Sequence, residues 1–426
     1  MIRLNIVANY IGAGSVFLLP ILAMPFILSA LGPAQFGLVG FVAMLQAFFG
    51  LLDAGISQAL VREIAHRFDG TGSGQKYTAK LLFGFERIYW LFALFAGCLI
   101  FLLADTISTE WLHLGATSIT IAKNTVYAAA VIFVCQFPGA VYRSVLVGIQ
   151  SQILLNSILL VAALFRHIGG VIVVLTWQTL SAYFIWQASI SLLETLIRGR
   201  CAWASIGFRR SEIQWDSNEL RLQWGGMASM AGAVLLGALT VQIDKIILSR
   251  MVPIEQFGYY SLASTVAIGA LQLIYPITQA ALPRAIQLHL EPFLLRKFYF
   301  KLAGLILIVI CFAAFIYIVF GKFLLDTWLR NQNSVEVIYP LLSILLLGTG
   351  LNSFYNIGYI NWMVHKKISR IYIVNILSIT LSLTLIPILV LKNGPIGAAF
   401  GWLSINLIGF LLSLGWVMRR NVEKYN

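Results

Sequence analysis

The sequence predicts an all-α integral membrane protein of about twelve transmembrane helices, arranged as two six-helix bundles. Hydrophobic residues make up 60% of the 426 residues and charged residues only 11%, whereas a soluble domain needs roughly 25% charged residues to cover its surface. The apolar residues gather in runs of about 20, the length that a helix needs to cross the hydrocarbon core. Because backbone polar groups in lipid must be satisfied within their own segment, and the short alternating strands of a barrel are absent, we expect these spans to be helical.

Twelve apolar runs, joined by short connections, mark the predicted spans: 5–31, 36–61, 81–104, 119–147, 153–175, 177–197, 222–249, 257–282, 302–324, 337–361, 368–391 and 396–418. The first run is too long for the apolar region of a signal peptide, so we expect it to be retained as a span. The longest connection is polar, rich in arginine and close to the midpoint of the chain. We therefore predict an N-terminal bundle at 1–197, a basic cytoplasmic linker at 198–221, a C-terminal bundle at 222–418 and a cytoplasmic tail at 419–426.

Lys and Arg are distributed unevenly between alternate loops. Most of the 29 basic residues fall on the side that holds the linker and both ends of the chain. By the positive-inside rule, both termini are expected in the cytoplasm, and an even number of spans agrees with this. The net charge of +13 then reflects membrane topology, and we expect no nucleic-acid partner.

A short motif occurs twice, about half a chain length apart. Near the start of the second span the chain reads Pro33-Ala34-Gln35-Phe36-Gly37, and near the start of the eighth it reads Pro253-Ile254-Glu255-Gln256-Phe257-Gly258. The same two spans end in Ala59-Leu60-Val61-Arg62 and Ala281-Leu282-Pro283-Arg284. Two matched ends of one helix indicate a duplicated six-helix unit. Because six is even, both copies enter from the same face, which predicts a parallel pseudo-two-fold repeat.

The chain also resembles the bacterial polysaccharide-biosynthesis flippases, the exporters of O-antigen and capsule repeat units within the multidrug/oligosaccharidyl-lipid/polysaccharide superfamily. The resemblance is carried by Leu31-Gly32-Pro33-Ala34-Gln35-Phe36-Gly37, Leu52-Asp53-Ala54-Gly55-Ile56, Asp244-Lys245-Ile246-Ile247-Leu248-Ser249 and Gln256-Phe257-Gly258-Tyr259-Tyr260-Ser261-Leu262-Ala263. It implies export of an undecaprenyl-pyrophosphate-linked oligosaccharide across the bacterial inner membrane, by alternating access through a polar cavity. A polysaccharide polymerase and a chain-length regulator are the protein partners that this role suggests.

Two charged residues in the middle of predicted spans are the first candidate site residues. A pyrophosphate favours arginine, whose charge-assisted hydrogen bonds survive partial desolvation, and Arg166 lies near the middle of the fifth span. An arginine at the bilayer centre costs at least about 2.5 kcal/mol, so Arg166 is expected to face protein or a water-filled cavity. Asp53 lies in the middle third of the second span, as an ion-coupling carboxylate or as a partner of a cavity arginine. The structural alternative is that Arg166 pairs with Asp53, or with a backbone carbonyl, to hold helices together.

Further candidates lie toward the ends of spans. Arg62, Arg143 and Arg284 are expected near the cytoplasmic side, where they either receive the pyrophosphate or extend their charges to the interface. Asp244 and Lys245 lie near the outer end of the seventh span as a candidate gate or substrate contact, and adjacent helix residues need separate partners.

Prolines in the first span are candidate hinges. Pro20 and Pro25 each remove a helix hydrogen bond, so the span is expected to bend or to carry a static kink there.

Two other classes of function were compared with a flippase. A multidrug antiporter of the same superfamily should hold an acidic pocket for cations, yet only Asp53 is an acid clearly deep in a span. A membrane enzyme needs catalytic residues on large outer loops, and the outer loops here are short. The sequence has no P-loop and no metal or nucleophile motif. We therefore expect no enzyme activity, no metal and no cofactor, with a proton or sodium gradient as a possible energy source.

Overall fold

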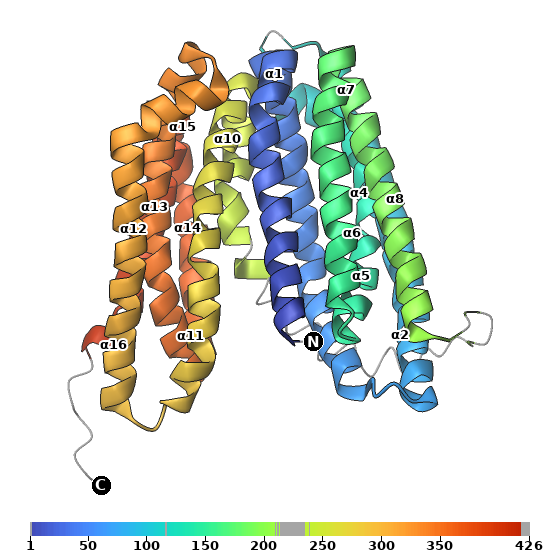
Figure 1. The fold of residues 1–426 in the computed structure, drawn as a ribbon. Helices are drawn as coiled ribbons and strands as arrows, with labels where there is room; N and C mark the ends of the chain where they lie inside the picture. Colours follow the sequence, from blue (N-terminus) through green and yellow to red (C-terminus); the bar gives the residue numbers. More distant parts are fainter. Residues whose placement is uncertain are drawn as a thin grey trace. The chain divides into compact units, whose positions relative to one another are not determined.

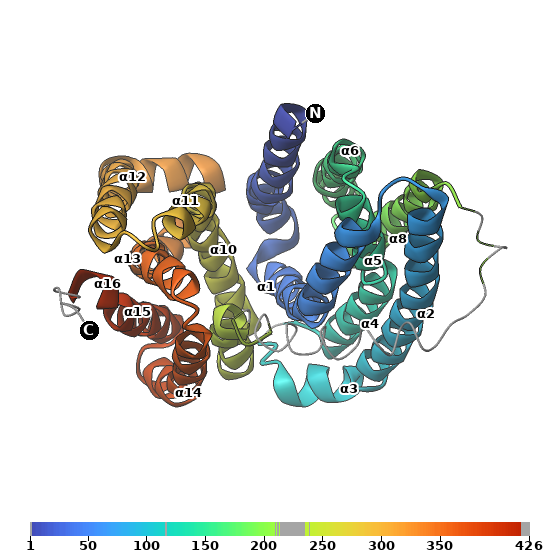
Figure 2. The same ribbon diagram turned by 90° about the horizontal axis from the view of Figure 1, so that it is seen from below.

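The computed structural model describes residues 2–115, 117–208 and 239–418, together with positions 210, 213 and 235–237. The described chain is almost wholly helical (Figures 1 and 2). It divides into two compact units. The first unit runs to Leu239 and includes Pro253–Glu255; the second comprises Thr240–Val252 and the chain from Gln256 onward.

The first unit holds ten labelled helices in chain order: α1 (Ile2–Arg67), α2 (Gly72–Leu102), α3 (Ala104–Thr106), the π-helix η1 (Ile107–Trp111), α4 (Ile119–Gln136), α5 (Gly139–Gly148), α6 (Gln152–Leu164), the π-helix η2 (Phe165–Gly169), α7 (Gly170–Trp177) and α8 (Leu180–Ile206). Beyond the helix at 239–251 the labelled elements are α10 (Ile254–Ala270), the 3-10 helix η4 (Leu271–Leu273), α11 (Tyr275–Gln287), α12 (Pro292–Leu329), α13 (Gln332–Val364), α14 (Ile368–Asn393), α15 (Pro395–Ser413) and α16 (Gly415–Met418).

Helix α1 is two membrane-crossing limbs joined at a break. Its 66 residues would extend about 100 Å as one straight helix, roughly three times the thickness of the hydrocarbon core. Gly32 interrupts it with φ 76° and ψ 167°, a conformation that is open essentially to glycine alone. Figure 1 shows the two limbs of α1 running in opposite directions. The predicted spans 5–31 and 36–61 fall on these two limbs.

The number of spans and their orientation stay predictions. Ten helical stretches among the described residues are long and apolar enough to cross a membrane. One of them, Phe17–Gly50, includes the break at Gly32. The predicted seventh span, 222–249, lies largely outside the described residues, as does the predicted tail at 419–426. The predicted spans 302–324, 337–361 and 368–391 each lie within one helix, and 177–197 lies on α8 except for its first three residues. The predicted spans 81–104, 119–147, 153–175, 257–282 and 396–418 each extend over more than one helical element.

Small residues bring three helices of the first unit close together. On α5, a methyl group added at Gly139 would lie 2.8 Å from the hydroxyl oxygen of Thr195 on α8. One added at Gly148 would lie 2.7 Å from the Cγ2 atom of Ile64 on α1. Close approach through small residues is a usual mode of helix packing in membranes, where lipid offers no hydrophobic driving force between helices. The short helix α5 is thereby held between α1 and α8.

A π-turn interrupts the helix that carries Arg166. Within η2 the regular hydrogen-bond ladder shifts, and side chains of α8 bind the carbonyl groups there. Trp186 donates from Nε1 to the carbonyl of Phe165 at 2.9 Å, and Gln187 donates from Nε2 to the carbonyl of Arg166 at 3.3 Å. Single π-turns inside α-helices are frequent at functional sites. Here the turn fixes the backbone from which the Arg166 side chain extends.

The second unit is built around the pair α13 and α15, with α14 beside them (Figure 1). Asn352 of α13 donates to the side-chain oxygen of Asn406 of α15 at 2.7 Å, an interhelical bond of the kind that adds modest stability in membranes. Helix α12 presents a row of exposed large apolar side chains, among them Ile308, Phe312, Phe315, Ile318 and Phe323. Such a surface suits contact with lipid chains.

Candidate functional site

A cavity of about 560 Å³ lies within the first unit, between α1, α4, α5 and α8. Its lining combines charged, amide, hydroxyl and aromatic side chains: Gln46, Phe49, Gly50, Asp53, Ser57, Gln58, Val61, Phe133, Gln136, Phe137, Ala140, Arg143, Ser144, Val147 and Arg198. The second limb of α1 supplies one wall, since its lining residues recur at spacings of three and four. A polar lining of this kind is unusual among apolar spans and indicates a binding site.

Asp53 is a fixed part of the cavity wall. Its carboxylate accepts a hydrogen bond from the Tyr89 hydroxyl at 2.5 Å, and the Ser57 hydroxyl lies 2.7 Å from each of its two oxygens. Tyr89 is buried and its ring stacks on Phe137, with centroids 5.1 Å apart. Two donors from two helices therefore orient the carboxylate toward the cavity. The partner of Asp53 is this pair of hydroxyls, and not Arg166.

Arg143 and Arg198 give the cavity its positive charge. Arg143 is exposed in the lining, whereas the side chain of Arg198 is only 11% exposed. The side chain of Arg198 reaches α5, because one of its terminal nitrogens lies 3.3 Å from the position of a methyl group added at Gly139. Gly139 and Arg143 are one helical turn apart on α5, so the two guanidinium groups face the same region.

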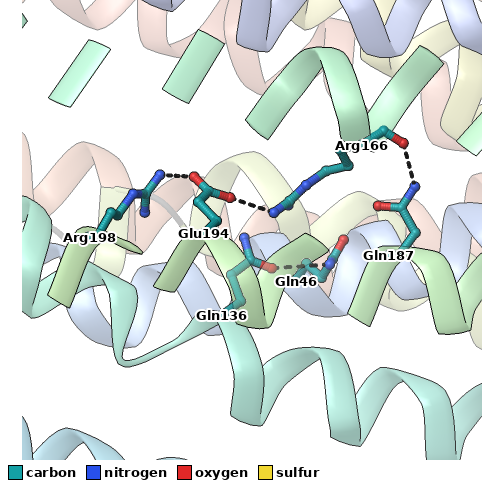
Figure 3. Close-up of polar contacts among 6 residues, drawn as sticks. All are labelled: Gln46, Gln136, Arg166, Gln187, Glu194 and Arg198. Carbon is teal, nitrogen blue, oxygen red and sulfur yellow. Dashed lines mark hydrogen bonds and ion pairs between the residues drawn. The ribbon is translucent and has the colours of Figure 1, made fainter. Parts of the chain in front are cut away.

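Glu194 bridges two arginines beside the cavity. It accepts a hydrogen bond from Arg166 Nη2 at 2.6 Å, and its other oxygen accepts one from Arg198 Nη2. The Glu194 side chain is 10% exposed and that of Arg166 16%. Figure 3 shows the three side chains in a row, with Arg166 approaching from η2 and the other two from α8. Arg166 lies outside the cavity lining and pairs with Glu194, which falls inside the predicted span 177–197.

Amides and aromatic rings complete the lining. Gln46 of α1 donates to the side-chain oxygen of Gln136 of α4 at 3.2 Å, as drawn in Figure 3. The ring of Phe133 lies 4.3 Å from that of Phe49 and 5.0 Å from that of Phe137, centroid to centroid. Amides bind sugar hydroxyls and aromatic faces pack against sugar rings, while arginines bind phosphate. The cavity thus offers groups for each polar part of a lipid-linked sugar.

The structure places the other predicted site residues elsewhere. Arg62 is exposed one residue beyond the lining residue Val61. Arg284 is exposed on α11 of the second unit, where it donates to Gln287 at 3.1 Å. Both remain candidates from the sequence alone.

The pair Asp244 and Lys245 is buried inside the second unit. Their charged atoms are 3.6 Å apart, and their side chains are 2% and 7% exposed. Tyr260 donates to the other oxygen of Asp244 at 2.6 Å, and Lys245 donates to the carbonyl of Val241 at 3.2 Å. Each residue thus has the separate partner that was expected, but the two charges also pair with each other, which the sequence analysis did not expect. The arrangement also suits a purely structural role.

Pro20 and Pro25 both lie in the first limb of α1. The one residue of α1 with non-helical backbone angles is Gly32. The break that the structure shows is therefore at the glycine between the two limbs, and the hinge role of the prolines stays a prediction.

Arg198, Glu194 and Tyr89 are the site residues that the sequence analysis missed. The predicted sixth span ends at 197, but α8 continues to Ile206. Arg198 therefore lies inside the helix with Glu194, and not in a linker. Their spacing of four residues was a usable signal, because an acid four residues before a base pairs on one helix face. No sequence pattern connects Tyr89 with Asp53, which lie on different helices.

The family model described as "Polysaccharide biosynthesis protein" matches residues 2–289. The chain belongs to this family. A protein of Shigella flexneri named "Putative O-antigen transporter" is 22% identical over 430 residues, which cover 99% of this chain and 98% of that protein.

Solved structures of transporters share the fold of this family member. "Lipid II flippase MurJ" in an inward closed conformation aligns with a TM-score of 0.74 and 14% identity, over 97% of this chain and 87% of its own. An inward-facing multidrug resistance MATE family transporter of the MOP superfamily aligns with a TM-score of 0.72 and 14% identity, over 97% and 98%. The sequence match therefore shows the polysaccharide biosynthesis family, and the structural match shows a fold shared with solved transporter structures.

Proposed function

We propose that this protein is a transporter, a flippase for an undecaprenyl-pyrophosphate-linked oligosaccharide such as an O-antigen or capsule repeat unit. It would move the lipid from the cytoplasmic to the periplasmic leaflet of the bacterial inner membrane by alternating access. The observation that carries the proposal is the cavity of the first unit, which combines Arg143 and Arg198 with amides and aromatic rings. The arginines suit the pyrophosphate, and the amides and rings suit the glycan. The polyprenyl tail can remain in the bilayer.

The lining also argues against a cationic drug as substrate. Two arginines reach the cavity, and the carboxylate of Asp53 is already engaged by two hydroxyls. A cation entering this space would meet like charge in a region of low dielectric, which costs several kcal/mol. Within the proposal, Asp53 is the carboxylate through which a proton or sodium gradient would act. Arg62, Arg284 and Lys245 are further candidate contacts along the path.

A leaflet assay tests the proposal. Cells depleted of the protein should accumulate the lipid-linked repeat unit where a lectin added outside spheroplasts does not reach it. Wild-type protein should restore access, and Arg143→Gln should restore it at least about tenfold less well, since a charge-assisted bond to phosphate contributes roughly 1.5–3 kcal/mol.

Arg67→Gln is the matched control. Arg67 lies on α1, pairs with Glu63 at 2.9 Å and is outside the cavity lining. An unchanged leaflet distribution on depletion would refute the flippase. If Arg143→Gln and Arg67→Gln restored lectin access equally poorly, the assignment of the cavity as the substrate site would be refuted.

A further inference from the structure

The contact of Glu194 with two arginines has a consequence for substrate affinity. Both of its carboxylate oxygens are engaged, one by Arg166 and one by Arg198. Of these two arginines only Arg198 lines the cavity. An anion that enters the cavity therefore meets an arginine that is already bound to an internal carboxylate.

Carboxylate and phosphate compete for the same face of a guanidinium group. Arginine presents its N–H donors in a planar fork, which matches both anions in the same geometry. Arg198 already gives Nη2 to Glu194, and its Nε is buried without a hydrogen-bond partner. A diphosphate can take both donors of this fork only by displacing Glu194.

When a diphosphate displaces Glu194 from Arg198, Glu194 keeps Arg166 as its partner. A buried carboxylate stripped of its cation carries a large desolvation cost, but Arg166 still binds Glu194 at 2.6 Å. The Arg166 backbone is fixed in turn by the π-turn and by the bond from Gln187. The cost of freeing Arg198 is therefore reduced, because Glu194 can shift wholly to Arg166.

We infer that Glu194 is a built-in competitor of the substrate's diphosphate for Arg198, and that Arg166 holds Glu194 while Arg198 binds the substrate. This inference rests on the proposed function. It assigns Glu194 a role in limiting affinity, since a transporter must bind its substrate weakly enough to release it on the far side. Glu194 and Arg166 are positioning residues here, because they act on the substrate through Arg198.

Diphosphate binding to purified full-length protein in detergent tests the inference. The probe is farnesyl diphosphate, and the readout is its Kd from calorimetric titration. Glu194→Gln removes the competing charge, so Kd should fall about three- to tenfold. Arg166→Gln leaves Glu194 with Arg198 alone, so Kd should rise by a similar factor. Opposite shifts from the two variants distinguish competition from a structural role, in which both variants would weaken binding.

Asp105→Asn is the matched control. Asp105 pairs with Lys123 at 2.5 Å, its side chain is 69% exposed and it lies outside the cavity lining. Asp105→Asn removes one negative charge, as Glu194→Gln does. It therefore separates a local effect of Glu194 from a change in net charge. The Kd of Asp105→Asn should equal that of wild type. If Glu194→Gln fails to fold, Glu194→Asp takes its place: its shorter side chain weakens the contact with Arg198, so Kd should still fall, and a rise in Kd would overturn the inference.

The results separate the two proposals. Wild-type binding with an unchanged or raised Kd in Glu194→Gln, or an unchanged or lowered Kd in Arg166→Gln, would overturn the role of Glu194 and leave the flippase intact. An equal fall in Kd for Asp105→Asn would also overturn it. Absence of binding by wild type, with an unchanged leaflet distribution on depletion, would refute the flippase itself.

Discussion

The hydroxyl of Tyr89 offers a direct test of how firmly Asp53 is built into the cavity. Tyr89→Phe removes the donor that lies 2.5 Å from the Asp53 carboxylate. The ring that stacks on Phe137 at 5.1 Å is kept, so packing changes little. Ser57 remains 2.7 Å from each carboxylate oxygen. The substitution therefore isolates one hydrogen bond to a charged group.

We expect this substitution to lower the free energy of unfolding by about 1.5–3 kcal/mol, the range for a hydrogen bond to a charged group. Tyr77→Phe is the matched control. Its hydroxyl donates to Glu63 at 2.8 Å, but Glu63 also pairs with Arg67, whose side chain is 52% exposed. Because that site is open to water, its loss should cost about 1 kcal/mol or less.

Unfolding by SDS, followed by tryptophan fluorescence of the purified protein, measures both changes. The same substitution in an Asp53→Asn background adds a second comparison. An uncharged amide needs the Tyr89 donor less, so the cost of Tyr89→Phe there should fall by about 1 kcal/mol or more. A cost no greater than that of Tyr77→Phe, or an equal cost in both backgrounds, would refute the bond as the source of stability.

Three other predictions concern close packing, backbone strain and buried charge. Gly139→Ala should cost about 1–3 kcal/mol of unfolding free energy and weaken diphosphate binding, because its methyl group meets α8 at 2.8 Å. Gly304→Ala, which adds a methyl group to open space, should leave both nearly unchanged. Gly32→Ala should cost about 1–3 kcal/mol in the same assay through its positive φ alone, since that site is sterically open. Asp244→Asn should cost about 3–5 kcal/mol by leaving Lys245 charged and buried, and adding Lys245→Met should recover part of that loss.

The membrane class and the helical spans follow from sequence because they depend on local properties. A run of apolar residues is sufficient to predict a span, since lipid requires each segment to satisfy its own backbone. The limbs of α1, on either side of Gly32, show this well: two runs and a Pro-Gly-containing junction predict them without any tertiary information. The end of α8 was less predictable. Hydropathy falls where the apolar run ends, near 197, but the helix continues to Ile206, where hydropathy marks no boundary.

The candidate site was only partly accessible from the sequence. Mid-span charge identified Asp53 and Arg166, and a basic residue toward the end of a span identified Arg143. None of these observations identifies a partner, so the sequence suggested pairing Asp53 with Arg166. In the structure Tyr89 and Ser57 bind Asp53, and Glu194 binds Arg166.

The sequence by itself thus determined that the chain is a helical membrane protein, and it predicted a cationic polar path. Only the tertiary structure decided which charges share a cavity and which neutralise each other. The physical reason is distance. Hydropathy sums over neighbours along the chain, whereas an ion pair or hydrogen bond between α2 and α1, or between η2 and α8, depends on a few ångströms set by helix packing.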